Sequence, residues 1–148
     1  MKVVVGADHA GFEVKEKVKN YLKRKGIEVE DVGTFSKDSV DYPDYAFQVA
    51  SKVSEKKVDF GVLVCKSGIG MSIAANKFKN VRAALVFTPE MAKLARSHND
   101  ANVLSLSGEF TKEEEVYKIL DTWLATNFEG GRHERRVGKI SKIEKENK

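Results

Sequence analysis

Cys65 is the residue of this sequence with the clearest chemical potential, because it ends an apolar run and precedes a glycine-rich turn. The run covers residues 59–65, and the turn reads Ser67-Gly68-Ile69-Gly70. A helical pattern follows, and a thiol at a helix N-terminus is biased toward the reactive thiolate. Backbone N–H groups of such a turn can converge on an oxyanion or a phosphate. The structural alternative is a small buried Cys before a tight connection that needs glycine.

Two further clusters combine groups that bind sugars or transfer protons. Asp8 and His9 follow the apolar run at residues 2–6, and His98 and Asn99 stand shortly before the run at residues 102–106. A carboxylate and an imidazole together can bind hydroxyl groups or move protons. The alternatives are that Asp8 caps the next helix and that His98 interacts with the end of a helix dipole.

Arg132 and Arg136 suggest an anion site near the end of the chain. They are four residues apart, so on a helix they share a face and can hold one phosphate. The alternative is a solvated basic helix end. The single Cys and the three His show no spacing typical of metal ligands, so we expect no metal and no cofactor.

Five apolar runs alternate with helical patterns, which predicts a parallel sheet between two helical layers. We therefore expect a three-layer α/β/α, Rossmann-like sandwich with a C-terminal helical tail. The most apolar run, at 59–65, is predicted to be central, and the alternating run at 27–32 to lie near an edge. Thr111-Lys112-Glu113-Glu114 is typical of a capping box. Ligands of such sheets bind at the carboxyl ends of the strands, where we expect all the polar clusters to meet.

Length and composition set limits on function. The 148 residues are 41% hydrophobic and 32% charged, which is typical of one globular domain spanning 1–148. No apolar run approaches the roughly 20 residues that cross a bilayer, and the apolar start is too short for a signal peptide. With one Cys there is no internal disulfide. We expect a soluble cytoplasmic protein without a membrane partner.

The net charge of +4 is concentrated in residues 132–148, while the rest of the chain carries equal numbers of acidic and basic residues. A nucleic-acid-binding protein would spread basic charge over a face. The tail holds no aromatic residue for base stacking, and Val137, Ile140 and Ile143 recur every three residues. We therefore expect no nucleic-acid partner, and a basic helix that crosses onto a second copy of the chain in a homodimer.

Five sequence blocks together resemble one family of sugar-phosphate isomerases. The family includes ribose-5-phosphate isomerase B and the isomerases of galactose 6-phosphate and allose 6-phosphate. The resemblance covers residues 1–143. The blocks are Gly6-Ala7-Asp8-His9-Ala10-Gly11, Asp41-Tyr42-Pro43, Cys65 to Gly70 with Ser72 to Lys77, His98-Asn99-Asp100-Ala101-Asn102-Val103-Leu104, and Glu129-Gly130-Gly131-Arg132-His133.

The resemblance implies a cofactor-free enzyme of the pentose phosphate pathway that interconverts ribose 5-phosphate and ribulose 5-phosphate through a cis-enediolate. It also implies a homodimer or tetramer with sites shared between subunits. Cys65 then matches the general base and His98 the residue that opens the sugar ring. The other matches are sugar binding by Asp8 and Asn99, a pocket wall at Tyr42, an enediolate cradle at Lys66, Ser67, Gly68, Ile69 and Gly70, and phosphate binding by His9, Arg132 and Arg136.

Two residues depart from the family pattern. Many relatives have Gly-Thr where this chain has Lys66-Ser67, and relatives often carry an Arg near the phosphate where this chain has Glu109. Two alternatives stay open: an isomerase of a six-carbon sugar phosphate, and a non-catalytic module that binds a phosphate ligand.

Overall fold

The computed structural model describes residues 1–147, which form one five-stranded sheet with parallel pairing throughout. The strands are β1 (Lys2–Ala7), β2 (Glu28–Asp31), β3 (Phe60–Cys65), β4 (Ala83–Leu85) and β5 (Val103–Ser107). Their order is β2-β1-β3-β5-β4. The central position predicted for β3 and the edge position predicted for β2 are confirmed. The reason is burial: β3 is buried along nearly its whole length, while β2 alternates polar residues that stay partly exposed.

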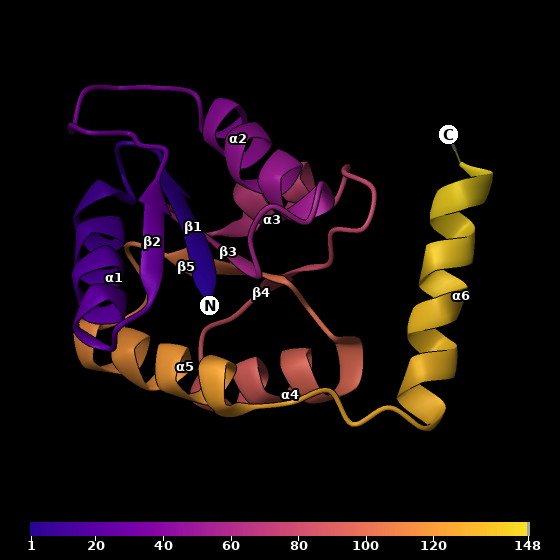
Figure 1. The fold of residues 1–148 in the computed structure, drawn as a ribbon. Helices are drawn as coiled ribbons and strands as arrows, with labels where there is room; N and C mark the ends of the chain where they lie inside the picture. Colours follow the sequence, from indigo (N-terminus) through magenta and orange to yellow (C-terminus); the bar gives the residue numbers. More distant parts are fainter. Residues whose placement is uncertain (148) are drawn as a thin grey trace.

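Helices cover both faces of the sheet, as Figure 1 shows. Successive strand residues point to opposite faces, so Val3 and Val5 enter one apolar core and Val4 enters the other. The first core is closed by α1 (Phe12–Arg24), α4 (Pro89–Asn99) and α5 (Glu113–Ala125), and the second by α2 (Tyr42–Ser54) and α3 (Ile69–Ala75). The predicted three-layer α/β/α sandwich is confirmed.

One predicted helix cap is present in the structure and another is not. Thr88 caps α4 by accepting a hydrogen bond from the Met91 N–H at 3.2 Å, as expected. The predicted capping box at Thr111 is wrong. Helix α5 has Lys112 at its N-cap position, and the buried Thr111 hydroxyl has no hydrogen-bond partner among residues 1–147. Because the helix begins one residue later than the motif requires, this hydroxyl faces the interior instead.

The last helix, α6 (Arg132–Glu146), stands to one side of the sandwich and is drawn in yellow in Figure 1. Its start packs against the end of α4, and near its other end the Glu144 carboxylate accepts a hydrogen bond from the Asn80 N–H at 3.1 Å. Two apolar side chains of α6, Ile140 and Ile143, remain 46% and 59% exposed. Among residues 1–147, no helix combines the length and the hydrophobicity needed to span a membrane.

Candidate active site

Cys65 lies at the carboxyl end of β3, where the chain turns into α3. Its side chain is buried, and its Sγ accepts a hydrogen bond from the Gly68 N–H at 3.2 Å. Gly68 has a left-handed backbone with φ of 81°, and its carbonyl accepts a bond from the buried Ser105 hydroxyl at 2.7 Å. This backbone conformation favours glycine and turns the N–H toward the sulfur. The thiol therefore packs among apolar side chains and also faces a backbone donor, which stabilises negative charge on sulfur.

Asp8 and His9 follow β1 at the same edge of the sheet. The buried Asp8 accepts hydrogen bonds from the N–H groups of Ala10 and Gly11 through Oδ1, both at 3.0 Å. It thus closes the turn before α1, whose N-cap residue is Gly11. A Cβ on Gly11 would lie only 2.2 Å from the Val64 carbonyl oxygen, so this turn packs directly on β3 beside Cys65.

His9, in the turn after β1, and Tyr42, the first residue of α2, flank this edge. His9 Nδ1 accepts a hydrogen bond from the Val40 N–H at 3.2 Å, which fixes the ring and leaves Nε2 outside that bond. Tyr42 is the first residue of α2, and its ring packs over the turn: a Cβ on Gly70 would meet it at 2.5 Å. Tyr42 and Gly70 therefore touch across the face of the turn.

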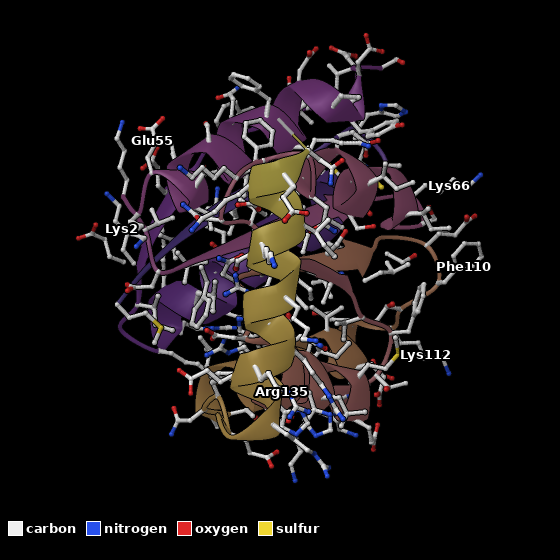
Figure 2. All side chains as sticks on the ribbon, turned by 90° about the vertical axis from the view of Figure 1, so that its right-hand side faces the viewer. Lys2, Glu55, Lys66, Phe110, Lys112 and Arg135 are labelled. Carbon is white, nitrogen blue, oxygen red and sulfur yellow. The ribbon has the colours of Figure 1, made fainter. Side chains whose placement is uncertain are left out.

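Lys66 and Glu109, the two residues that depart from the family pattern, face each other. Lys66 Nζ lies 3.8 Å from a Glu109 carboxylate oxygen, and both side chains are largely exposed. The Ser107 hydroxyl joins the two loops, because it donates to the Lys66 carbonyl at 2.6 Å and accepts from the Glu109 N–H at 3.2 Å. Lys66 points outward from the body in Figure 2, so its charge is directed toward Glu109 and solvent. Ser67 Oγ accepts from the Ile69 N–H at 3.1 Å and stabilises the turn.

His98 and Asn99 do not join this edge, so the expectation that all polar clusters meet there within one chain is wrong. They end α4, and they precede Val103, the first residue of β5. Cys65 pairs instead with Ser107, the last residue of that strand. The length of β5 separates the two ends by about 13 Å at the usual rise per residue. Because α4 runs antiparallel to the strands, its C-terminus necessarily lies at their amino ends.

Arg132 and Arg136 lie with His98, away from Cys65. Both arginines are exposed at the start of α6, and the neighbouring His133 ring stacks on the His98 ring with centroids 4.0 Å apart. Figure 2 shows Arg135, in the same part of α6, well separated from Lys66. The structure thus divides the predicted site residues into two groups at opposite ends of the sheet.

A partly buried set of contacts that the sequence did not reveal holds the turn after His98. The Arg82 guanidinium donates to the carbonyls of Asn99 and Asp100, at 3.0 and 2.8 Å. Arg96 donates to the Asp100 carboxylate at 3.0 Å and to the Ala101 carbonyl at 2.8 Å. Asp100 itself has a positive φ of 47°, which ends the helix. The i,i+4 spacing connects Arg96 with Asp100, but no spacing rule connects Arg82, which lies just before β4, the strand next to β5.

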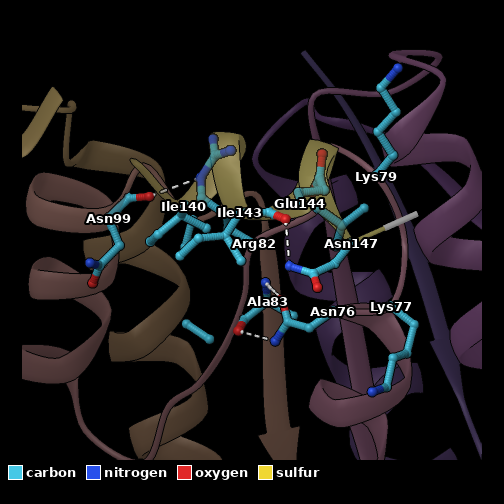
Figure 3. A pocket seen from close by; sticks show the side chains of 13 residues that line it. Asn76, Lys77, Lys79, Arg82, Ala83, Asn99, Ile140, Ile143, Glu144 and Asn147 are labelled. Atoms are coloured by element: carbon cyan, nitrogen blue, oxygen red, sulfur yellow. Dashed lines mark hydrogen bonds between the residues drawn. The ribbon is translucent and has the colours of Figure 1, made fainter. Parts of the chain in front are cut away.

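A groove of about 770 Å³ lies between α6 and the amino ends of β4 and β5, far from Cys65. Figure 3 shows Ile140 and Ile143 above it and the side chains of Asn76, Arg82 and Asn99 around it. Its floor is apolar, with Val81, Ala83, Ala84 and Ala101. A groove with an apolar floor and a polar rim suits a packing surface better than a reaction site.

Burial lowers the pKa of His133 below its usual range, and the nearby positive charges of His98, Arg132 and Arg136 add to the effect, opposed by Glu129. His133 therefore stays neutral to lower pH than a free histidine. The sequence singled out Arg132 and Arg136 in this segment but not His133 or Glu129. Their role depends on a contact with α4 that the fold alone creates.

Comparison with known proteins places the chain in a family. Residues 3–140 match the family model described as Ribose/Galactose Isomerase. The chain is 46% identical to ribose-5-phosphate isomerase B of Escherichia coli over 97% of this chain and 96% of that one. A ribose 5-phosphate isomerase of Thermotoga maritima superimposes with a TM-score of 0.93 at 57% identity, covering 95% and 97% of the two chains. Ribose-5-phosphate isomerase B of Mycoplasma genitalium with bound ribulose-5-phosphate superimposes with a TM-score of 0.95 at 45% identity, covering 99% and 97%. The chain belongs to the Ribose/Galactose Isomerase family.

Proposed function

We propose that this protein is an aldose–ketose isomerase that interconverts ribose 5-phosphate and ribulose 5-phosphate, as in the pentose phosphate pathway. The observation that carries the proposal is the Cys65 sulfur at the carboxyl edge, with the Gly68 N–H bonded to it. It occurs in a chain similar over nearly its whole length to ribose-5-phosphate isomerase B, one relative of which holds bound ribulose-5-phosphate.

Cys65 acts in this proposal as the single base of the reaction. The thiolate removes the proton from C2 of the open-chain aldose, and the electron pair forms the C1–C2 double bond of the enediolate as the carbonyl oxygen becomes negative. The thiol then returns the proton to C1 as the C1–C2 double bond becomes the carbonyl bond of C2. The C2 hydroxyl proton passes to the negative C1 oxygen, which completes the ketose. A base that serves both carbons must lie on one face of the sugar, and both its protonated and its deprotonated forms must be populated at the working pH.

The turn after Cys65 stabilises the charge that develops on the enediolate. Lys66, Ser67, Gly68, Ile69 and Gly70 form the cradle in this proposal, and their backbone N–H groups donate to the developing oxyanion. Such preorganised donors each contribute a few kcal/mol to transition-state stabilisation. Asp8 binds sugar hydroxyls, and Tyr42 closes the pocket against Gly70, the glycine its ring touches.

His98, Asn99, Arg132 and Arg136 reach a substrate at Cys65 only from a second copy of the chain. We infer that the active assembly is a homodimer or a tetramer of such dimers, in which His98 opens the sugar ring and Asn99 binds a sugar oxygen. The arginines, with His9 of the other copy, hold the phosphate. The separation of the two groups along β5 supports this inference.

Exposed apolar side chains supply the surfaces for such an assembly. On α2 and α3, Phe47, Ile69 and Ile73 are each at least half exposed, and the groove under α6 is lined by Ile140 and Ile143. Residues 132–147 would then contact the partner, and residue 148 of the predicted tail lies outside the described residues. Light scattering of the purified chain is expected to report a dimer or a tetramer, and a fully active monomer would contradict shared sites.

An isomerisation assay with Cys65→Ala tests the proposed function. Nuclear magnetic resonance follows each sugar phosphate directly, and we expect ribose 5-phosphate to convert faster than allose 6-phosphate or galactose 6-phosphate. The variant is expected to lose about 10²–10⁴-fold in turnover, the usual contribution of a general base, while it still binds substrate by calorimetry. Ser51→Ala, a change on the outer part of α2, serves as the matched control. A Cys65→Ala enzyme that keeps its rate would remove the thiol from the mechanism.

A further inference from the structure

Two imidazoles and a carboxylate converge where α4 meets the start of α6. His98 Nε2 lies 3.6 Å from a Glu129 carboxylate oxygen, and the His98 and His133 rings stack with an angle of 10° between their planes. One ligand atom from each of His98, Glu129 and His133 lies within 4.8 Å of the other two. This set combines two nitrogen donors with one carboxylate, the composition of many zinc sites.

Backbone hydrogen bonds hold the chain segments that carry the three side chains. The Glu129 N–H donates to the Ser97 carbonyl at 3.0 Å, which ties the segment before α6 to the last turn of α4. The His133 N–H donates to the Gly130 carbonyl at 3.1 Å, and the His133 side chain is buried. The segments are therefore already ordered, and an ion has to order only the side chains themselves.

Exposure differs among the three side chains in a way that leaves the site accessible. His133 is buried, whereas the side chains of His98 and Glu129 are 39% and 60% exposed. An ion can approach from the Glu129 side, and the imidazoles need to tilt out of their stack for both nitrogens to face it. Arg132, next in the chain to His133, opposes a cation, so the carboxylate of Glu129 is needed to offset that charge.

We propose that His98, His133 and Glu129 form a site for a divalent ion of the zinc class, and that occupancy of this site inhibits the isomerase. The inhibition rests on the proposed function, because the ion would occupy the His98 nitrogen that acts on the sugar ring. Binding itself does not rest on that function. The site has three protein ligands, which leaves a coordination position for water or for a substrate oxygen.

Calorimetric titration of the untagged, EDTA-treated protein with zinc chloride in a phosphate-free buffer tests the site. We expect one ion per chain, and removal of one ligand in His133→Asn or Glu129→Gln should weaken binding at least about tenfold, as even outer-shell changes commonly do. Cys65→Ser should bind zinc as the unchanged protein does, because the thiol lies at the other end of the sheet. The absorbance spectrum of the protein with cobalt in place of zinc reports the type of ligand. Unlike calorimetry, this measurement contains no heat from changes in folding.

The outcomes separate the two proposals. Loss of zinc binding in Cys65→Ser, or equal binding by His133→Asn and the unchanged protein, would overturn the site. If the protein isomerises ribose 5-phosphate but binds no zinc at micromolar concentrations, the site is refuted and the proposed function stands. If zinc binds as expected but no sugar phosphate reacts, the function fails and the site stands. Circular dichroism of each variant confirms that the fold is retained.

Discussion

Mixing two inactive variants tests directly whether each active site draws on two chains. Cys65→Ala removes the base at the carboxyl edge, and His98→Asn removes the imidazole at the amino edge. In a mixed dimer with shared sites, one site receives both changes and the other receives neither. If each chain instead built its own site, every site of the mixed dimer would carry one change.

The expected recovery of activity follows from where the fold places the two residues and from the number of intact sites in a mixed dimer. Cys65 is level with the end of β5 and His98 precedes its start, so about 13 Å of strand separates them, against the roughly 3 Å at which catalytic groups act. One chain therefore cannot place both on one sugar. Random re-pairing makes half of the dimers mixed with one intact site each, so the mixture should recover about a quarter of the unmodified activity.

The assay measures conversion of ribose 5-phosphate after the two variants are unfolded together and refolded. Each variant refolded alone gives the baseline. The control mixes Cys65→Ala with Cys65→Ser, which leaves no intact site in any pairing and should stay at that baseline. If the first mixture is no more active than its two parents, while light scattering shows that re-pairing took place, the reasoning from strand register is refuted.

Three further changes address the pocket wall and the buried charge network. Gly70→Ala places a Cβ within 2.5 Å of the Tyr42 ring, so Tyr42 must move, and steady-state kinetics should show a raised KM with the fold intact by circular dichroism. Lys15→Met removes a fully buried ammonium group that donates to the Asp31 carboxylate and to the Thr34 carbonyl. The free energy of unfolding in urea should fall by about 3 kcal/mol, and an unchanged midpoint would contradict that network. Although burial acts to raise the pKa of Asp31, hydrogen bonds from lysines and a backbone N–H hold it below its usual range. The stability that ionised Asp31 contributes is therefore present above about pH 4 and is lost as the pH falls through the lowered pKa. In urea titrations at pH 3 and pH 7, the free energy of unfolding of Asp31→Asn should therefore change less with pH than that of the unmodified chain.

Much of the fold could be predicted because local patterns coincide with the tertiary environment. The continuous apolar run ending at Cys65 became the central strand, since only a strand covered on both faces tolerates such a run. The Thr111 motif failed because a capping box describes hydrogen bonds within one turn. It carries no information about which side chains the core will enclose, and the Thr111 hydroxyl is buried.

The carboxyl-edge half of the site was also predictable. Asp8, Cys65 and the turn to Gly70 each follow a strand directly, and parallel strands bring their ends together whatever their order. His98 and Asn99 were misplaced because they precede a strand, and residues before a parallel strand lie at the opposite edge. The sequence pattern shows that both residues come before a strand, whereas the carboxyl-end rule for ligand sites concerns residues that follow one.

The sequence by itself determined the element order, the two apolar faces and the residue types at Cys65 and its turn. Only the tertiary structure decided that Arg132 lies with His98 at the end of the sheet opposite Cys65, that Lys66 faces Glu109, and that His133 stacks on His98. The physical reason is the distance along the chain over which each effect acts. Propensity, capping and periodicity act over a few residues along the chain, whereas these contacts join segments that are brought together by packing of the two apolar cores.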